Sequence, residues 1–202
     1  MVRNRSKSEE KRDSILDSAI CLFIEQGFEN TSMDQIAQRA NVSKQTVYSH
    51  FAGGKEELFS ASIRSKCTSH QLDAEAFKKL KDPRSALTTL AFRFSELLQT
   101  QEAVHVFRTC VAQAETHPQL SRLFFAEGPG NMFDQVEFLL LQFHQQGLLN
   151  IEQPRFAAVQ FLMMIHGESR LRLELNVEPR PEEETQHYVQ NCVDTFMRAY
   201  GC

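Results

Sequence analysis

The stretch from Thr31 to Phe51 (TSMDQIAQRANVSKQTVYSHF) constrains the fold most, because it has the pattern of two short helices joined by a tight turn. Ser32 and Gln35 have the spacing of a capping box, which starts a helix. Asn41 tolerates the left-handed backbone at which a helix ends and the chain turns. Ser43 is a good N-cap for a second helix. The periodicity places the following residues on the buried side of the first helix: Met33, Ile36, Ala37 and Ala40.

The second helix divides into an apolar side and a polar side. Val47 and Phe51 fall on the apolar side and anchor the helix. The opposite side presents one side-chain amide and two hydroxyls to solvent. Such groups can read DNA, because a glutamine amide pairs bidentately with adenine and a hydroxyl can contact any base edge. A polar side of this kind also occurs on ordinary core helices, but the two-helix-and-turn context favours a surface that enters a DNA groove. The base-facing residues are Gln45, Thr46 and Ser49, and those suited to phosphates are Lys44, Tyr48 and His50.

The chain before this stretch completes a three-helix headpiece. An amphipathic helix is predicted over residues 11–26, and it ends at Gly27 as a left-handed cap, with Phe28 packing back on the last turn. The first ten residues are polar and aperiodic, so they are expected to be disordered without a partner. Arg3 and Arg5 either enter a minor groove or belong to a solvated tail.

The rest of the chain has helical periodicity interrupted only by glycine and proline, without β-alternation, which predicts an all-α fold. Pro83 starts one helix, and Gly128-Pro129-Gly130 either kinks or breaks a later one. A connecting helix is expected over residues 55–71, which leaves the headpiece and enters the C-terminal bundle. Its inward residues are Leu58, Phe59, Ile63 and Cys67.

The last two helices differ in character. The helix from Pro154 to about residue 173 is apolar nearly all round and must be covered on more than one side, whereas residues 181–200 carry one apolar stripe. Such a pair suits a four-helix interface with a second copy of the chain. We therefore predict a headpiece over residues 1–54 and a ligand-binding and dimerisation domain over residues 55–202.

Composition limits the location and the partners. The net charge of −4 does not exclude DNA, since phosphate attraction depends on a local basic patch. The N-terminus lacks the apolar core of a secretory signal, and the apolar runs are too short to span a bilayer, so a cytoplasmic location is expected. Five scattered cysteines without a C-x-x-C motif indicate neither a disulfide framework nor a zinc ribbon.

No pattern of residues indicates an enzyme or a cofactor. The sequence lacks G-x-S-x-G, H-E-x-x-H, a phosphate loop and a dinucleotide fingerprint. His166 and Glu168 are metal-ligating types, with His105 or His144 as further ligands, but scattered histidines are more often surface or core residues, and no metal site is predicted.

A ligand cavity in the bundle needs apolar side chains and a few polar ones. Sixteen phenylalanines are available, and plain core packing is the alternative role for most of them. The residues predicted to line such a cavity are Phe94, Phe107, Cys110, Phe138, Met163 and His166.

Three segments in the N-terminal quarter, TSMDQIAQRA, NVSKQTVYSHF and KEELF, closely resemble the DNA-binding signature of the TetR family of transcriptional regulators. Asn41 stands where the family usually has glycine, and Ala52-Gly53-Gly54 makes the next turn one residue longer than is common. The segments AETHPQLSRLFFAEGP, QQGLLN and IHGESRLRLEL resemble the C-terminal domain of its AefR-like branch.

The resemblance implies a homodimer, joined through its last two helices, that binds double-stranded DNA at a palindromic operator and is released by a small apolar ligand. Repression is the family's usual outcome. Two other interpretations stay open. The first is a regulator with the same DNA-binding headpiece that responds to a redox or metal signal, and the second is a helical enzyme or adaptor whose headpiece is vestigial. The predicted DNA-binding residues are Thr31, Ser32, Lys44, Gln45, Thr46, Tyr48, Ser49, His50 and Lys55.

Overall fold

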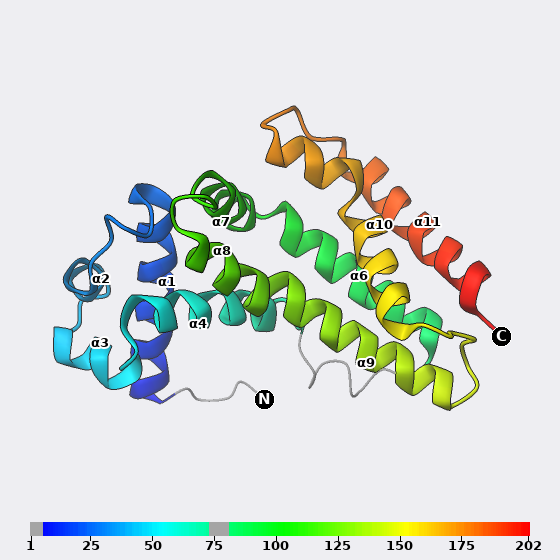
Figure 1. Ribbon diagram of the computed structural model, residues 1–202, viewed down its shortest axis with the longest axis horizontal. Helices are drawn as coiled ribbons and strands as arrows, with labels where there is room; N and C mark the ends of the chain where they lie inside the picture. The colour runs from blue at the N-terminus through cyan, green and yellow to red at the C-terminus, as the bar shows by residue number, and fades with distance from the viewer. Residues whose placement is uncertain (1–5, 73–80) are drawn as a thin grey trace. The chain divides into compact units, whose positions relative to one another are not determined.

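The computed structural model describes residues 6–72 and 81–202, and this part of the chain consists of helices and short connections without a β-strand (Figure 1). The predicted all-α fold is confirmed. The helices are α1 (Lys7–Gln26), α2 (Met33–Arg39), α3 (Lys44–His50), α4 (Gly54–Ser69), α6 (Pro83–Gln99), α7 (Gln101–Ala112), α8 (Pro118–Phe125), the π-helical turn η1 (Ala126–Gly130), α9 (Asn131–Gln145), α10 (Pro154–Glu174) and α11 (Glu182–Tyr200).

Packing divides the chain into two compact units. The head unit comprises Met1–Lys66 and His105–Glu127, and the bundle unit comprises Cys67–Val104 and Gly128–Cys202. The head unit therefore includes α8 and most of α7 in addition to the first three helices and most of α4. The boundary expected after residue 54 separates a DNA-binding from a ligand-binding function, and it stays a prediction.

Helix α1 begins four residues earlier than its apolar periodicity indicates. Ser6 caps it with a complete capping box: the Glu9 amide donates to Ser6 Oγ (3.2 Å), and the Ser6 amide donates to Glu9 Oε2 (2.7 Å). These paired hydrogen bonds satisfy two amides of the first turn, so residues 7–10 are helical and the expected disorder there is wrong. Arg3 and Arg5 lie outside the described residues.

The end of α1 follows its predicted signal in part. The Gly27 amide donates to the Phe23 carbonyl (3.1 Å), and Phe28 returns to pack on Phe23 with ring centroids 5.3 Å apart. Gly27 has a positive φ of 83°, but its ψ of 165° lies outside the left-handed helical region. The backbone therefore leaves the helix in an extended direction and continues toward α2.

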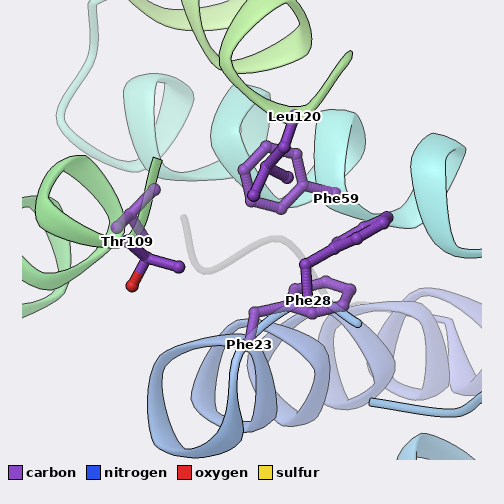
Figure 2. Close-up of a pocket in the computed structure, with 6 residues that line it drawn as sticks. Phe23, Phe28, Phe59, Thr109 and Leu120 are labelled. Atoms are coloured by element: carbon purple, nitrogen blue, oxygen red, sulfur yellow. The ribbon is translucent and has the colours of Figure 1, made fainter. Parts of the chain in front are cut away.

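An aromatic cluster lies at the centre of the head unit. Phe59 of α4 makes edge contacts with Phe23 and Phe28, at centroid distances of 5.6 and 5.8 Å. Val106 and Thr109 of α7 and Leu120 of α8 complete the small apolar pocket around this cluster; Thr109 and Leu120 are seen there beside the rings in Figure 2. The core of the headpiece thus includes side chains that lie about fifty to a hundred residues later in the chain.

Helix α4 is more deeply buried than its sequence pattern indicates. The four predicted inward residues are buried, but so is every residue from 58 to 63. Small side chains make this possible, and the Ser62 hydroxyl donates to the Leu58 carbonyl (2.9 Å), which satisfies a buried polar group. Burial in this segment therefore extends beyond the four predicted inward residues.

The bundle unit packs α6, α9, α10 and α11 around one apolar core. Helix α6 begins at Pro83, as predicted, and the Asp82 side chain caps it by accepting from the Ser85 amide. The Gly128-Pro129-Gly130 segment forms the second half of η1, so the helical backbone continues from α8 into α9 through a π-helical turn and is not broken.

Helix α10 is interrupted at Gly167, which has φ 48° and ψ −164°. The Tyr188 hydroxyl of α11 donates to the Met164 carbonyl at this interruption (2.7 Å). The sequence indicated an uninterrupted helix here, because one glycine in an apolar run leaves its periodicity intact. The tyrosine that packs at the kink comes from a different helix.

A buried arginine follows the kink. Arg170 is 4% exposed, and its guanidinium donates to the Glu174 carboxylate (2.8 Å), the Ala103 carbonyl (3.1 Å) and the Leu98 carbonyl. His166 lies 3.1 Å from the same carboxylate of Glu174. This polar cluster joins α10 to the end of α6 and the start of α7 within the bundle unit.

One face of α10 is not covered by the part of the chain that the structure describes. Phe156 is 62% exposed and Met163 is 51% exposed, whereas Phe161 and Ile165 on the other face are buried. The expectation that this apolar helix is covered on more than one side is not met within a single copy of the chain. Leu171 and Leu175 near its C-terminal end are exposed as well.

Candidate nucleic-acid interface

The turn between α2 and α3 has the local geometry that the sequence predicts. Gln35 and Ser32 form a capping box at the start of α2. Asn41 has a positive φ of 53°, and the Val42 amide donates to the Ala37 carbonyl (3.0 Å) across the turn. Ser43 then caps α3 by accepting a hydrogen bond from the Thr46 amide. Each of these bonds joins residues at most five positions apart.

Two apolar anchors hold α3 on the head unit. Val47 is fully buried and Phe51 is 1% exposed, and both belong to the core that contains Ile36 and Ala40 of the α2 segment. The guanidinium of Arg12 lies over the Phe51 ring, 5.4 Å from its centroid. Sequence periodicity missed this cation–π contact, because Arg12 belongs to the polar side of α1.

The polar side of α3 points away from this core. Gln45 and Ser49 are exposed, Tyr48 is 41% exposed, and Thr46 is half-buried. The Ser49 hydroxyl donates to the Thr46 carbonyl (2.8 Å), and the Thr46 hydroxyl shares a hydrogen bond with Ser43 (2.8 Å). The predicted division of the helix into an anchored side and an exposed polar side is confirmed, while the contact of these residues with DNA stays a prediction.

Lys44 is paired with a carboxylate that the sequence analysis did not single out. Its ammonium lies 2.8 Å from Asp34 of α2, and the hydrogen bond and charge of Asp34 raise the pKa of Lys44. Both side chains are mostly solvent-exposed, so the pair contributes little to stability and can be broken by a phosphate. Asp34 also reduces the positive charge of this surface.

Thr31 does not belong to the exposed surface. Its side chain is 1% exposed, and its hydroxyl is within donor distance of the carbonyls of Gly27 (2.7 Å) and Leu22 (3.2 Å). The prediction of a DNA-contacting side chain is therefore corrected: Thr31 fixes the loop between α1 and α2. Ser32 is exposed at the start of α2, where its hydroxyl accepts from the Gln35 amide.

Lys55 and His50 lie at the edges of the surface. The Lys55 ammonium donates to the carbonyls of Phe28 (2.8 Å) and Glu29 (3.3 Å) and lies 4.6 Å from the centroid of the Phe28 ring. It therefore ties the start of α4 to the loop before α2, a contact that no sequence pattern indicates. His50 is half-buried beside Phe51.

Comparison with known proteins identifies the family of this chain. A family model for bacterial regulatory proteins of the tetR family matches residues 15–62, the segment that holds α2 and α3. The model for the C-terminal domain of AefR-like transcriptional repressors matches residues 85–202, more than half of the chain. The chain belongs to the TetR family. The resemblance found in the sequence is thereby confirmed.

Curated relatives of this TetR-family chain match parts of it. The HTH-type transcriptional regulator SrpR of Pseudomonas putida is 37% identical over 71 residues, which are 35% of this chain and 33% of SrpR. The icaADBC negative regulator IcaR of Staphylococcus aureus is 27% identical over 128 residues, 63% of this chain and 62% of IcaR. The chain thus spans about a third to three fifths of the length of these relatives.

Solved structures match the TetR-family chain over nearly its whole length. A TetR-family regulator from Mesorhizobium loti has a TM-score of 0.77 and 26% identity, covering 98% of this chain and 100% of that one. The flavonoid-responsive regulator FrrA has a TM-score of 0.70 and 30% identity, covering 96% and 98%. Proteins of this family are DNA-binding transcriptional regulators and not enzymes, which confirms the prediction made from missing catalytic motifs.

The six residues predicted to line an effector cavity are divided between the two units. Phe107 and Cys110 belong to the head unit and the other four to the bundle unit. Phe138 and Met163 are 60% and 51% exposed, so they lie on the surface of this chain and not inside it. Helical periodicity identified apolar faces but does not say whether a face packs in a core or stays open. Phe94 packs at the edge of the bundle core, and His166 is bound to Glu174.

The described residues were also compared with the requirements of a reactive thiol, a metal site and a membrane-spanning helix. Burial raises the pKa of the Cys110 thiol to about 12, so the reactive thiolate is scarce at neutral pH. In residues 6–72 and 81–202, three His, Cys, Asp or Glu side chains nowhere gather as they would around a metal ion. Within the same ranges, no helix combines the length and apolar composition needed to cross a bilayer.

Proposed function

We propose that this protein is a repressor that binds a palindromic DNA operator as a homodimer and is released by a small apolar ligand. The observation that carries the DNA-binding part is the two-sided α3: buried anchors Val47 and Phe51 on one side, and exposed hydrogen-bonding groups on the other. In a helix-turn-helix protein, such a side of the second helix enters the major groove.

The dimer in this proposal forms through α10 and α11. A single copy exposes Phe156 and Met163 on α10, spaced two helical turns apart, and Tyr188 on α11. A second copy related by a two-fold axis covers the same residues from the other side, because an isologous interface uses one surface twice. Two headpieces held in this way read two half-sites about 34 to 36 Å apart, one turn of DNA.

The release of DNA by a ligand rests on family evidence and on one feature of the packing. The similar structure FrrA is described as flavonoid-responsive, and we extend an apolar effector to this chain by analogy. Val106 and Leu120, from α7 and α8, share a core with Phe59 and with the anchors of α3. A ligand that binds better when α7 and α8 are displaced therefore shifts the headpiece toward a conformation with lower DNA affinity.

The test of DNA binding is a selection of operator sequences from random duplex DNA with the full chain, followed by fluorescence anisotropy on the selected duplex. The double variant Gln45→Ala/Ser49→Ala is expected to lose specific binding, and Gln145→Ala, an exposed glutamine of α9, is the matched control. Retention of specific binding by the double variant contradicts the proposed surface. Far-UV circular dichroism confirms that each variant is folded.

The test of release adds an apolar compound library, peroxide or a chelator to the preformed complex. Release by an apolar compound alone supports the proposal. If peroxide releases the DNA and a Cys110→Ser change abolishes that release, the protein is a redox-responsive regulator instead. The raised pKa of the Cys110 thiol argues against this outcome. Sedimentation of the free protein reports whether it is a dimer.

A further inference from the structure

We propose that the half-site read by α3 is built on A·T pairs, with Gln45 as the residue that selects adenine. This inference rests on the proposed function, since it assumes that α3 enters the major groove. It specifies which bases the groove presents there, which neither the family nor the relatives determine.

The chemistry of Gln45 favours adenine. In the major groove an adenine presents one acceptor, N7, and one donor, the N6 amino group, whereas a guanine presents two acceptors, N7 and O6. A glutamine amide carries one donor group and one acceptor, so it matches adenine with two hydrogen bonds and guanine with only one. Gln45 is exposed, and among the described residues its amide has no hydrogen-bond partner to give up.

The cations that normally read guanine are engaged elsewhere. Lys44 pairs with Asp34 at 2.8 Å, and a phosphate that breaks this exposed pair takes the ammonium in place of a base edge. Arg39, the only arginine of α2 and α3, donates two hydrogen bonds to the Glu25 carboxylate, at 2.5 and 2.7 Å. A guanidinium that uses its fork on a carboxylate cannot use the same two donors on N7 and O6 of guanine.

The remaining groups of α3 also disfavour guanine. The Ser49 hydroxyl proton is committed to the Thr46 carbonyl, so its oxygen is left to accept, as from an adenine N6 amino group. The exposed Tyr48 ring offers an apolar contact, which suits the methyl group of thymine. Donor groups aimed at O6 and N7 are thus scarce across this surface.

The experiment uses the operator obtained by selection with the full chain, in which the adenine nearest Gln45 is replaced by 7-deazaadenine, which lacks the N7 acceptor. We expect wild-type protein to lose about 5- to 150-fold in affinity for the modified duplex, because the Gln45 amide donor is left without its acceptor while the contact with N6 remains. Gln45→Ala should bind both duplexes equally, and Gln145→Ala should lose as much as the wild type. In a parallel selection, Gln45→Arg should exchange adenine for guanine at one position of each half-site.

The outcomes separate this inference from the proposed function. If wild-type protein selects a specific duplex whose α3-contacted positions are G·C, or if Gln45→Ala is as sensitive to 7-deazaadenine as the wild type, the adenine assignment is overturned while DNA binding stands. If no sequence is selected at any salt concentration, both are overturned. A Gln45→Arg protein that selects the wild-type sequence also overturns the assignment.

Discussion

The kink of α10 gives a quantitative prediction for Gly167→Ala. A Cβ atom built on Gly167 lies 2.7 Å from Cε1 of Tyr188, closer than Cβ atoms approach other atoms in folded proteins, and 3.0 Å from its hydroxyl oxygen, which is a tight contact. The backbone at Gly167, with φ 48° and ψ −164°, is near a region that only glycine adopts readily. Two separate costs therefore add at this position.

The sum of these costs sets the expected loss of stability. The backbone conformation costs an alanine about 1 to 3 kcal/mol. Tyr188 can move away from the new methyl group only by giving up its hydrogen bond to the Met164 carbonyl, worth about 1 kcal/mol. We expect Gly167→Ala to destabilise the bundle unit by about 2 to 4 kcal/mol.

Urea unfolding followed by far-UV circular dichroism measures this loss, since the chain has no tryptophan. Gly147→Ala is the matched control: Gly147 also has a positive φ, of 71°, but a Cβ there meets nothing within 4 Å. Its cost should be limited to the backbone, about 1 kcal/mol. In a Tyr188→Ala background, Gly167→Ala should lose the steric part of its cost. Equal effects of the two glycine substitutions in the wild-type background would refute the steric argument.

Three further predictions test the bundle unit. Arg170→Met removes a buried cation, and with it a charged partner of Glu174 and the donors to the Leu98 and Ala103 carbonyls, so unfolding in urea should show a loss of about 3 to 5 kcal/mol; a loss below about 1 kcal/mol contradicts this role. The hydrogen bond from Arg84 lowers the pKa of Asp194, so the stability it contributes is present above the ordinary pKa of 3.8 and is lost as pH falls through the depressed value. Asp194→Asn should therefore weaken the acid dependence of the melting temperature between about pH 5 and pH 2, and an unchanged profile contradicts the pairing. Met163→Glu should convert dimers to monomers in sedimentation experiments without lowering helix content, and an unchanged dimer means that the interface lies elsewhere.

The helix-turn-helix segment was predictable because its signals are local. The capping box of Ser32, the left-handed Asn41 and the N-cap Ser43 each involve residues at most five positions apart. The burial of Val47 follows from its helical spacing relative to Phe51. Local hydrogen bonds of this kind depend little on the rest of the fold. The sequence therefore predicted both the position of the turn and the side of α3 that stays exposed.

The parts that were not predictable depend on residues distant in the sequence. Asp34 pairs with Lys44 ten positions later, and no periodicity specifies that pair. Thr31 is a small polar residue before a helix, a position that is often exposed, and only the approach of the α1 carbonyls buries it. The exposure of Phe138 shows the same limit, because an apolar helical face has the same pattern whether it packs in a core or remains open.

The shared core of the head unit bears on how a ligand that displaces a later helix could change the position of α3. If the headpiece had a separate core, displacing a later helix would leave it unchanged. Here Val106, Cys110 and Leu120 contribute to the same core as Val47 and Phe51, and close packing means that such a core resists small displacements or rearranges as a whole. The headpiece and α7–α8 are therefore one packed body, and under the proposed function a ligand need only bias that body between two arrangements.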